Sequence, residues 1–213
     1  MPVEVASSTI VTMLKFEELS LKRELDRLPP RFRVAFAASC AQRLSSIYRS
    51  FLVQRGQTDR ADHCDDALNY VWIHILTTPE MSTTDRLLAE VMALIPDQDA
   101  PGWTPLTAYG EDALSALAYC LRCLQSGNAQ EAAWAAGRAY EALDYFVTIR
   151  DDISPNELGA EARVLSDPLI QAELERQALD IADLRSTGES LSQELLATLR
   201  QRSVAEQALT IVR

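Results

Sequence analysis

Residues 113–146 read ALSALAYCLRCLQSGNAQEAAWAAGRAYEALDYF, and this stretch decides the fold class of the chain. Apolar residues recur at helical spacing on both sides of Gly127-Asn128. Glycine ends helices because it adopts the left-handed conformation without strain, and asparagine begins them by accepting a main-chain hydrogen bond. The stretch therefore predicts a helical hairpin, with one helix over Glu111 to Ser126 and a second from Asn128 to about Arg150.

The second helix of this hairpin gathers small residues on one face. That face carries Ala132, Ala135, Ala136, Ala139, Ala142, Leu143 and Phe146. Small side chains let helix backbones approach closely, so this face is predicted to lie in the core. Trp134, Glu141 and Tyr145 lie roughly on the opposite side of the helix. Aromatic residues there favour either a second packing layer or a protein interface.

Periodicity and helix-end signals extend the helical prediction to most of the chain. The predicted elements are a short helix from Lys15 to Pro29-Pro30, helices over 30–54, 59–76 and 82–95, a loop from Pro96 to Pro105, a short helix opened by the capping box Ser154-Pro155-Asn156-Glu157, and a long helix after Asp167-Pro168. Neither a strand ladder nor a βαβ alternation is visible.

The prediction is an all-α protein with a single, bundle-like domain of about seven to eight helices. Residues 1–14 lack sustained periodicity and are predicted to form a loose N-terminal arm, with the helical domain over 15–213. Gly188 is a possible break in the long C-terminal helix. Without a break, about 35 residues would extend roughly 50 Å, beyond a compact domain of this size. An overhanging end could join two copies as a homodimer.

Charge and composition limit the classes of partner. The 213 residues include 31 acidic and 20 basic side chains, for a net charge of -11. This surplus disfavours nucleic acid and favours a basic protein partner, although it could equally serve solubility alone. Because no run of eighteen apolar residues and no signal-peptide pattern occurs, we expect no membrane contact and a cytoplasmic location. The four cysteines are then expected to be reduced.

Two neighbouring segments carry opposite charge. The segment from Arg27 to Gln57 contains six arginines and no carboxylate. The helix after it carries Asp59, Asp62 and Asp66 on one face, with Asp65 nearby. Such a row is either a solvated face, a set of internal partners for the arginines, or a surface for another protein.

Catalytic and metal-binding patterns are weak. His63 and His74 are the only histidines, and eleven helical residues would separate them by roughly 16 Å, too far to share a metal ion. Cys120 and Cys123 have CxxC spacing but lie within a predicted helix, so structural thiols are favoured. Nucleophile-elbow and phosphate-loop motifs do not occur. We expect no catalytic residues, no cofactor and no metal.

Several segments resemble a known family. They are FAASCAQRL over 36–44, followed by Tyr48, Phe51, Asp59, Ala67-Leu68 and Trp72, and later Asp167-Pro168-Leu169-Ile170-Gln171 with Glu173, Arg176, Gln177 and Asp180. These segments resemble the YjaG-like bacterial proteins, a domain-of-unknown-function family, over roughly Phe16 to Arg185. Gln42 stands where that family usually has glutamate, and residues 186–213 match poorly. The resemblance implies a helical, cytoplasmic protein without assigned catalytic residues.

The resulting hypothesis is a non-catalytic protein-binding protein, most concretely an immunity-type protein that sequesters a basic toxin enzyme. Charge complementarity between an acidic helical surface and a basic enzyme would speed their association. The candidate partner-binding residues are Asp59, Asp62, Asp65, Asp66, Trp134, Glu141 and Tyr145. One alternative is a metal- or small-molecule-binding helical enzyme centred on His63. Another is a homodimeric housekeeping protein.

Overall fold

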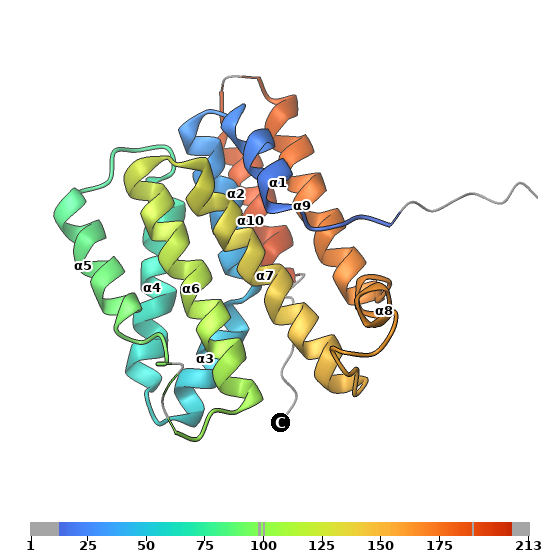
Figure 1. Cartoon of the computed structure of the whole chain (residues 1–213). Helices are drawn as coiled ribbons and strands as arrows, with labels where there is room; N and C mark the ends of the chain where they lie inside the picture. The colour runs from blue at the N-terminus through green and yellow to red at the C-terminus, as the bar shows by residue number, and fades with distance from the viewer. Residues whose placement is uncertain (1–12, 98, 100, 189, 206–213) are drawn as a thin grey trace, which may run out of the picture.

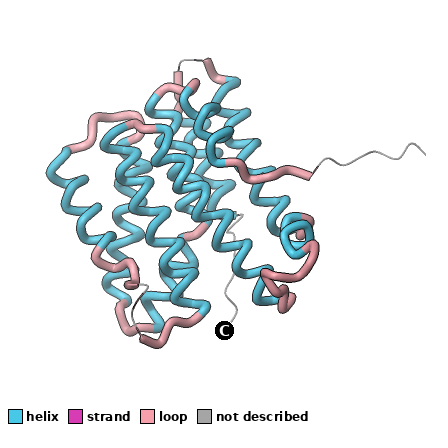
Figure 2. Tube along the Cα trace, in the orientation of Figure 1, coloured by secondary structure: helices cyan, strands magenta, loops and turns pink. Residues whose placement is uncertain are grey.

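The computed structural model describes residues 13–97, 99, 101–188 and 190–205, and its regular structure is helical throughout this part of the chain (Figures 1 and 2). The helices are α1 (Glu18–Asp26), α2 (Pro30–Arg43), α3 (Ser45–Gln54), α4 (Thr58–His74), α5 (Met81–Met92), α6 (Pro105–Ser126), α7 (Ala129–Arg150), α8 (Ala160–Leu165), α9 (Pro168–Ser186) and α10 (Gln193–Ala205). The predicted all-α class is confirmed. The predicted arm falls largely outside the described residues, which begin at Met13.

Helix α2 is the centre of the fold. It packs against α3, α4, α6, α7, α9 and α10, and every residue from Val34 to Ala41 is buried. In Figure 1, α2 lies behind α7. A helix that is apolar on all sides is stable only in such a central position, because no face of it suits water.

The α6–α7 hairpin forms as predicted, with the most extensive helix–helix packing of the fold. Gly127 ends α6 with φ +62°, and its N–H donates to the Cys123 carbonyl oxygen. Asn128 begins α7 by accepting a hydrogen bond from Gln130 N–H at 2.9 Å. Helix α6 starts six residues earlier than predicted because Thr104 caps it and Pro105 occupies its first turn.

Two predicted long helices are interrupted, which corrects the helix count to ten within the described residues. The helix predicted over 30–54 bends at Leu44, so α2 and α3 run in different directions. The predicted long C-terminal helix breaks at Gly188, whose φ is +68°. The residues after the break return as α10, which packs on α2. Of the two alternatives that the sequence left open at Gly188, the structure has the break, and the homodimer through the C-terminal helix stays a prediction.

The capping box at Ser154 does not open a helix. Residues 154–158 form turns, and α8 begins only after Gly159, which has φ +84°. The cap at Asp167 is correct, since its side chain accepts a hydrogen bond from Leu169 N–H at 2.8 Å. No helix in the described part of the chain is both long and apolar enough to span a bilayer.

Arg33 fastens the start of α2 to two neighbouring helix ends. Its guanidinium donates to the carbonyl oxygens of Leu25, Asp26 and Leu28 at the end of α1, and to that of Gly127 after α6, at 2.8–3.0 Å. Helix C-termini leave carbonyl oxygens without intrahelical donors, and a cation there also opposes the helix dipole. One arginine of the basic segment therefore has a structural role.

Candidate functional site

The acidic row on α4 is partly neutralised within the molecule. Arg49 of α3 contacts Asp62 at 2.9 Å and Asp65 at 2.5 Å. Tyr48 donates its hydroxyl to the other Asp65 oxygen at 2.7 Å. Asp59 and Asp66 remain exposed. Two of the four predicted partner-binding aspartates thus serve as internal partners of the arginine segment, one of the alternatives that the sequence left open.

His63 pairs with a neighbouring helix. Its Nε2 lies 2.5 Å from Glu90 of α5, and Arg86 binds the same carboxylate at 2.9 Å. Among the described residues, no group of three or more histidine, cysteine, aspartate or glutamate side chains is placed to hold a metal ion. The contacts of His63 are those of a side chain that joins α4 to α5.

The other predicted residues, Trp134, Glu141 and Tyr145, form a stripe along α7 together with Arg138. Trp134 stacks at a tilt on Tyr119 of α6, with ring centroids 5.3 Å apart. Tyr145 meets Tyr109 of α6 at 5.4 Å. Both α7 rings are partly exposed, so they pack along the α6–α7 seam and still present an edge to solvent.

Carboxylates cluster around this stripe. Arg138 contacts Asp112 of α6 at 3.1 Å and Glu141 at 2.9 Å. Burial raises the pKa of Asp112 to about 7; Arg138 lowers it, and the nearby charges of Glu141 and Glu111 raise it. Burial also raises the pKa of Glu141, with further contributions from like charges that include Asp144.

The acidic surface so formed draws on four helices. We call it the acidic seam, and it comprises Glu18 of α1, Glu111 and Asp112 of α6, Glu141 and Asp144 of α7, and Glu161 of α8. In addition to burial, the charge of Glu18 raises the pKa of Glu141, and the charge of Glu161 raises the pKa of Asp144. The aspartates of α4 do not join it, since α6 lies between α4 and α7 (Figure 1). The seven predicted residues therefore belong to two separate surfaces.

A buried ionic cluster connects α2, α9 and α10. Arg43 makes a two-point contact with Glu173 at 2.9 and 3.0 Å and binds Asp180 at 3.0 Å. Arg202 of α10 binds the second oxygen of Asp180. Gln177 donates to Glu173 at 2.9 Å and to the Ala136 carbonyl oxygen at 3.2 Å.

Composition and spacing do not predict this cluster. Arg43 and its acidic partners are 130 and 137 positions apart, and nothing local marks them as a pair. Arg43, Glu173 and Asp180 are at most 2% exposed, so the sequence places charges where apolar residues are usual. The resemblance to a known family could have pointed to this cluster. The segments that carry the resemblance contain all four of its residues Arg43, Glu173, Gln177 and Asp180.

The four cysteines are free and buried. Burial raises the pKa of the Cys64 and Cys123 thiols to about 12, so they stay protonated at neutral pH. The Sγ of Cys40 lies 3.3 Å from Arg43, yet burial still raises its pKa. A protonated, buried thiol is a poor nucleophile. Cys120 and Cys123 are buried in α6, as the structural interpretation of the CxxC spacing predicts.

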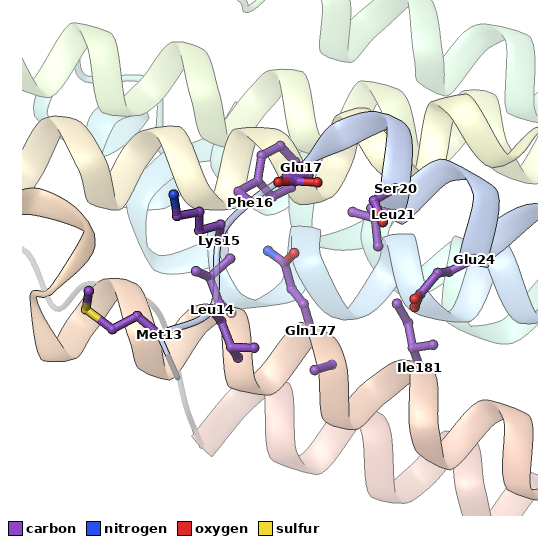
Figure 3. A pocket seen from close by; sticks show the side chains of 12 residues that line it. Met13, Leu14, Lys15, Phe16, Glu17, Ser20, Leu21, Glu24, Gln177 and Ile181 are labelled. Carbon is purple, nitrogen blue, oxygen red and sulfur yellow. The ribbon is translucent and has the colours of Figure 1, made fainter. Parts of the chain in front are cut away.

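A pocket of about 390 Å³ lies between the N-terminal segment and α9 (Figure 3). Its wall is fixed by Gln171 of α9, which accepts from Leu14 N–H at 2.9 Å and donates to the Leu14 carbonyl oxygen at 3.0 Å. In Figure 3 the Gln177 side chain rises from α9 toward the N-terminal segment that carries Phe16. Since Gln177 also binds Glu173, this pocket borders the buried ionic cluster.

Together these features define a class of protein: an all-helical protein whose helices surround a buried central helix, with a buried ionic cluster and an acidic seam. The chain belongs to the family described as "Protein of unknown function (DUF416)", whose pattern matches residues 20–211. The match extends past Ser186, so the C-terminal part also follows the family, contrary to the expectation from the sequence.

A solved structure shares this fold. The crystal structure of a DUF416 family protein from Shewanella baltica OS155, at 1.91 Å resolution, superposes with a TM-score of 0.74. The sequences are 16% identical, and the match covers 86% of this chain and 93% of that chain. At this identity the likeness supports the fold alone. None of the curated proteins matches this chain.

Proposed function

We propose that this chain is a non-catalytic protein that binds a basic protein through the acidic seam and the aromatic edges of α7. The observation that carries the proposal is the α7 stripe, where Glu141 lies between partly exposed Trp134 and Tyr145 within a group of carboxylates. Aromatic anchors inside a charged rim are typical of protein-binding surfaces. Most concretely, we propose an immunity-type protein that covers a toxin enzyme.

The geometry favours α7 over the α4 row as the contact surface. Asp62 and Asp65 share Arg49, so a partner's cation would compete with an arginine already in place. At the acidic seam, Arg138 is likewise shared by Asp112 and Glu141, but burial and the further like charges around them still raise both pKa values, so one arginine leaves repulsion there. A cationic partner would relieve this repulsion and speed encounter at low salt.

The test uses the product of a toxin-like reading frame beside the gene. Binding is measured by titration calorimetry, and inhibition is measured as loss of that product's enzymatic activity. We expect full inhibition at a one-to-one ratio. Lack of binding, or binding without inhibition, would reject the immunity role.

Matched charge variants locate the surface. The double variant Glu141→Gln, Asp144→Asn removes two charges from the acidic seam, and Asp59→Asn, Asp66→Asn removes two from α4. We expect the first to weaken binding by about tenfold and the second by much less. Equal weakening by both would show that net charge, and not the acidic seam, governs binding.

Two further proposals concern kinship and location. We propose that the chain belongs to the YjaG-like group within its family. In support of this, residues from the segments that resemble that group lie in contact in one buried cluster: Arg43, Glu173, Gln177 and Asp180. Members of that group should then carry an arginine and two acids at these positions. We also propose a cytoplasmic location, supported by four free thiols. Fractionation of the host cells tests it, and recovery outside the cytoplasm would reject it.

A further inference from the structure

A second pocket, separate from the acidic seam and the buried ionic cluster, lies between α3, α4 and α10. Its volume is about 440 Å³, within the range of small-ligand sites. Its polar lining includes Gln42, Ser45, Arg49, Asp65, Asn69 and Arg200. Ser45 is 7% exposed, so part of this polar lining is well shielded from water.

The acceptor oxygens of this pocket already hold donors. Trp72 donates its indole N–H to Gln42 Oε1 at 3.1 Å, and Arg200 donates to Asn69 Oδ1. Indole and guanidinium groups only donate, so they fix which way each amide faces. Asp65 receives Tyr48 on one oxygen and Arg49 on the other.

Donor groups remain in the pocket. With its oxygen held by Arg200, Asn69 keeps its amide N–H groups, for which the described residues supply no acceptor. Ser45 Oγ accepts from Gln42 Nε2 at 3.2 Å, which leaves the Ser45 hydroxyl hydrogen free to donate. A pocket whose amide and carboxylate oxygens are engaged, while the Asn69 amide and the Ser45 hydroxyl can still donate, selects a ligand that only accepts.

The charges of the lining residues also favour an anion as the ligand. Arg49 is paired with Asp62 and Asp65, whereas the described contacts of Arg200 are an amide oxygen and the Trp72 ring, 5.9 Å from its guanidinium carbon. Stacking on an aromatic ring holds a guanidinium in place without neutralising it. The Asp65 carboxylate opposes an anion, but both of its oxygens are turned to Tyr48 and Arg49.

We propose that this pocket binds the oxyanion group, phosphate or carboxylate, of a small molecule. Arg200 supplies the charge, and Asn69 and Ser45 supply hydrogen bonds. Charge-assisted hydrogen bonds of this kind are stronger than neutral ones. The bound anion links α10 to α3 and α4, so binding also stabilises the folded chain.

The test measures binding of inorganic phosphate, acetate and chloride to the full chain at constant ionic strength, by calorimetry and by the thermal unfolding midpoint. Saturable one-to-one binding of phosphate or acetate, with none of chloride, is expected, and the preferred anion identifies the oxyanion. Arg200→Gln should weaken binding by about tenfold or more. Asn69→Asp has nearly the same shape but replaces donors with a carboxylate that neutralises Arg200, so it should abolish binding.

The control is Arg163→Gln, which removes the same charge from an exposed pair with Glu157 on another part of the surface. It should bind phosphate or acetate as the unmodified chain does, and the variants should match that chain in helical circular dichroism without ligand. The proposal is overturned by absent or non-saturable binding, by equal binding of chloride, by full binding in Asn69→Asp, or by an equal loss in Arg163→Gln.

Discussion

At the scale of single residues, Asp112 is a carboxyl group whose ionisation the fold opposes. Burial raises its pKa from 3.8 to about 7, even though Arg138 lies 3.1 Å away. The folded carboxyl thus keeps its proton to a higher pH than the unfolded one. Its stabilising contribution is complete below about pH 4 and is lost as the pH rises toward 7, by on the order of 2–4 kcal/mol.

Asp112→Asn should remove this pH dependence. We expect the variant and the unmodified chain to have similar free energies of unfolding near the acidic end of this window, and the variant to be more stable at neutral pH and above. Urea unfolding at a series of pH values measures the difference. If the variant is instead less stable than the unmodified chain at neutral pH, the ion pair with Arg138 outweighs burial.

Arg43 provides a second residue-scale prediction. Arg43→Met leaves Glu173 buried without its two-point partner, so the free energy of unfolding should fall by about 3–5 kcal/mol. Adding Glu173→Met removes the carboxylate that Arg43→Met leaves without its partner, and should restore part of the lost free energy of unfolding. The exposed pair of Arg163 and Glu157 is the control, where Arg163→Ala should cost less than about 1 kcal/mol. A double variant less stable than Arg43→Met would show that shape, and not charge, governs this position.

At the scale of helices, replacing glycine with alanine should have opposite effects on stability at two positions, Gly110 and Gly137. A Cβ on Gly110 of α6 would lie 2.4 Å from Phe51 Cγ of α3, whereas one on Gly137 of α7 would lie 3.5 Å from the Phe16 ring. Gly110→Ala should therefore destabilise by about 1–3 kcal/mol, because α3 and α6 must move apart. Gly137→Ala should stabilise by about 0.5–1 kcal/mol through helix propensity. Thermal unfolding of both variants measures this, and a stabilising Gly110→Ala would contradict the close packing of α3 on α6.

Helix ends show how far the sequence determines the fold. Gly127 and Asn128 act locally, and their caps form where the sequence predicts them. The bend at Leu44 has no such local signal, because it is set by what α2 and α3 pack against. The ionic cluster could not be predicted from local sequence at all. Arg43 and Asp180 are 137 positions apart and come into contact only in the folded chain. The candidate partner-binding residues were proposed individually from the sequence. That they lie on two separate surfaces, on α4 and on α7, follows only from the position of α6 between these helices.

At the scale of the whole molecule, α2 makes the fold one cooperative unit. It packs against six other helices and is joined to α1 through Arg33, and the ionic cluster connects α9 and α10 to it. Unfolding in urea should therefore give coincident transitions by helical circular dichroism and by tryptophan fluorescence, which reports on Trp72 in α4, Trp103 before α6 and Trp134 in α7. Truncation after Ser186 removes Arg202 from Asp180 and uncovers the α2 surface under buried Leu199. We expect the midpoints of both transitions to shift together to a lower urea concentration, because α10 packs on the central helix α2. Separate transitions in the intact chain, or a truncated chain of unchanged stability, would show that α10 is an independent appendage.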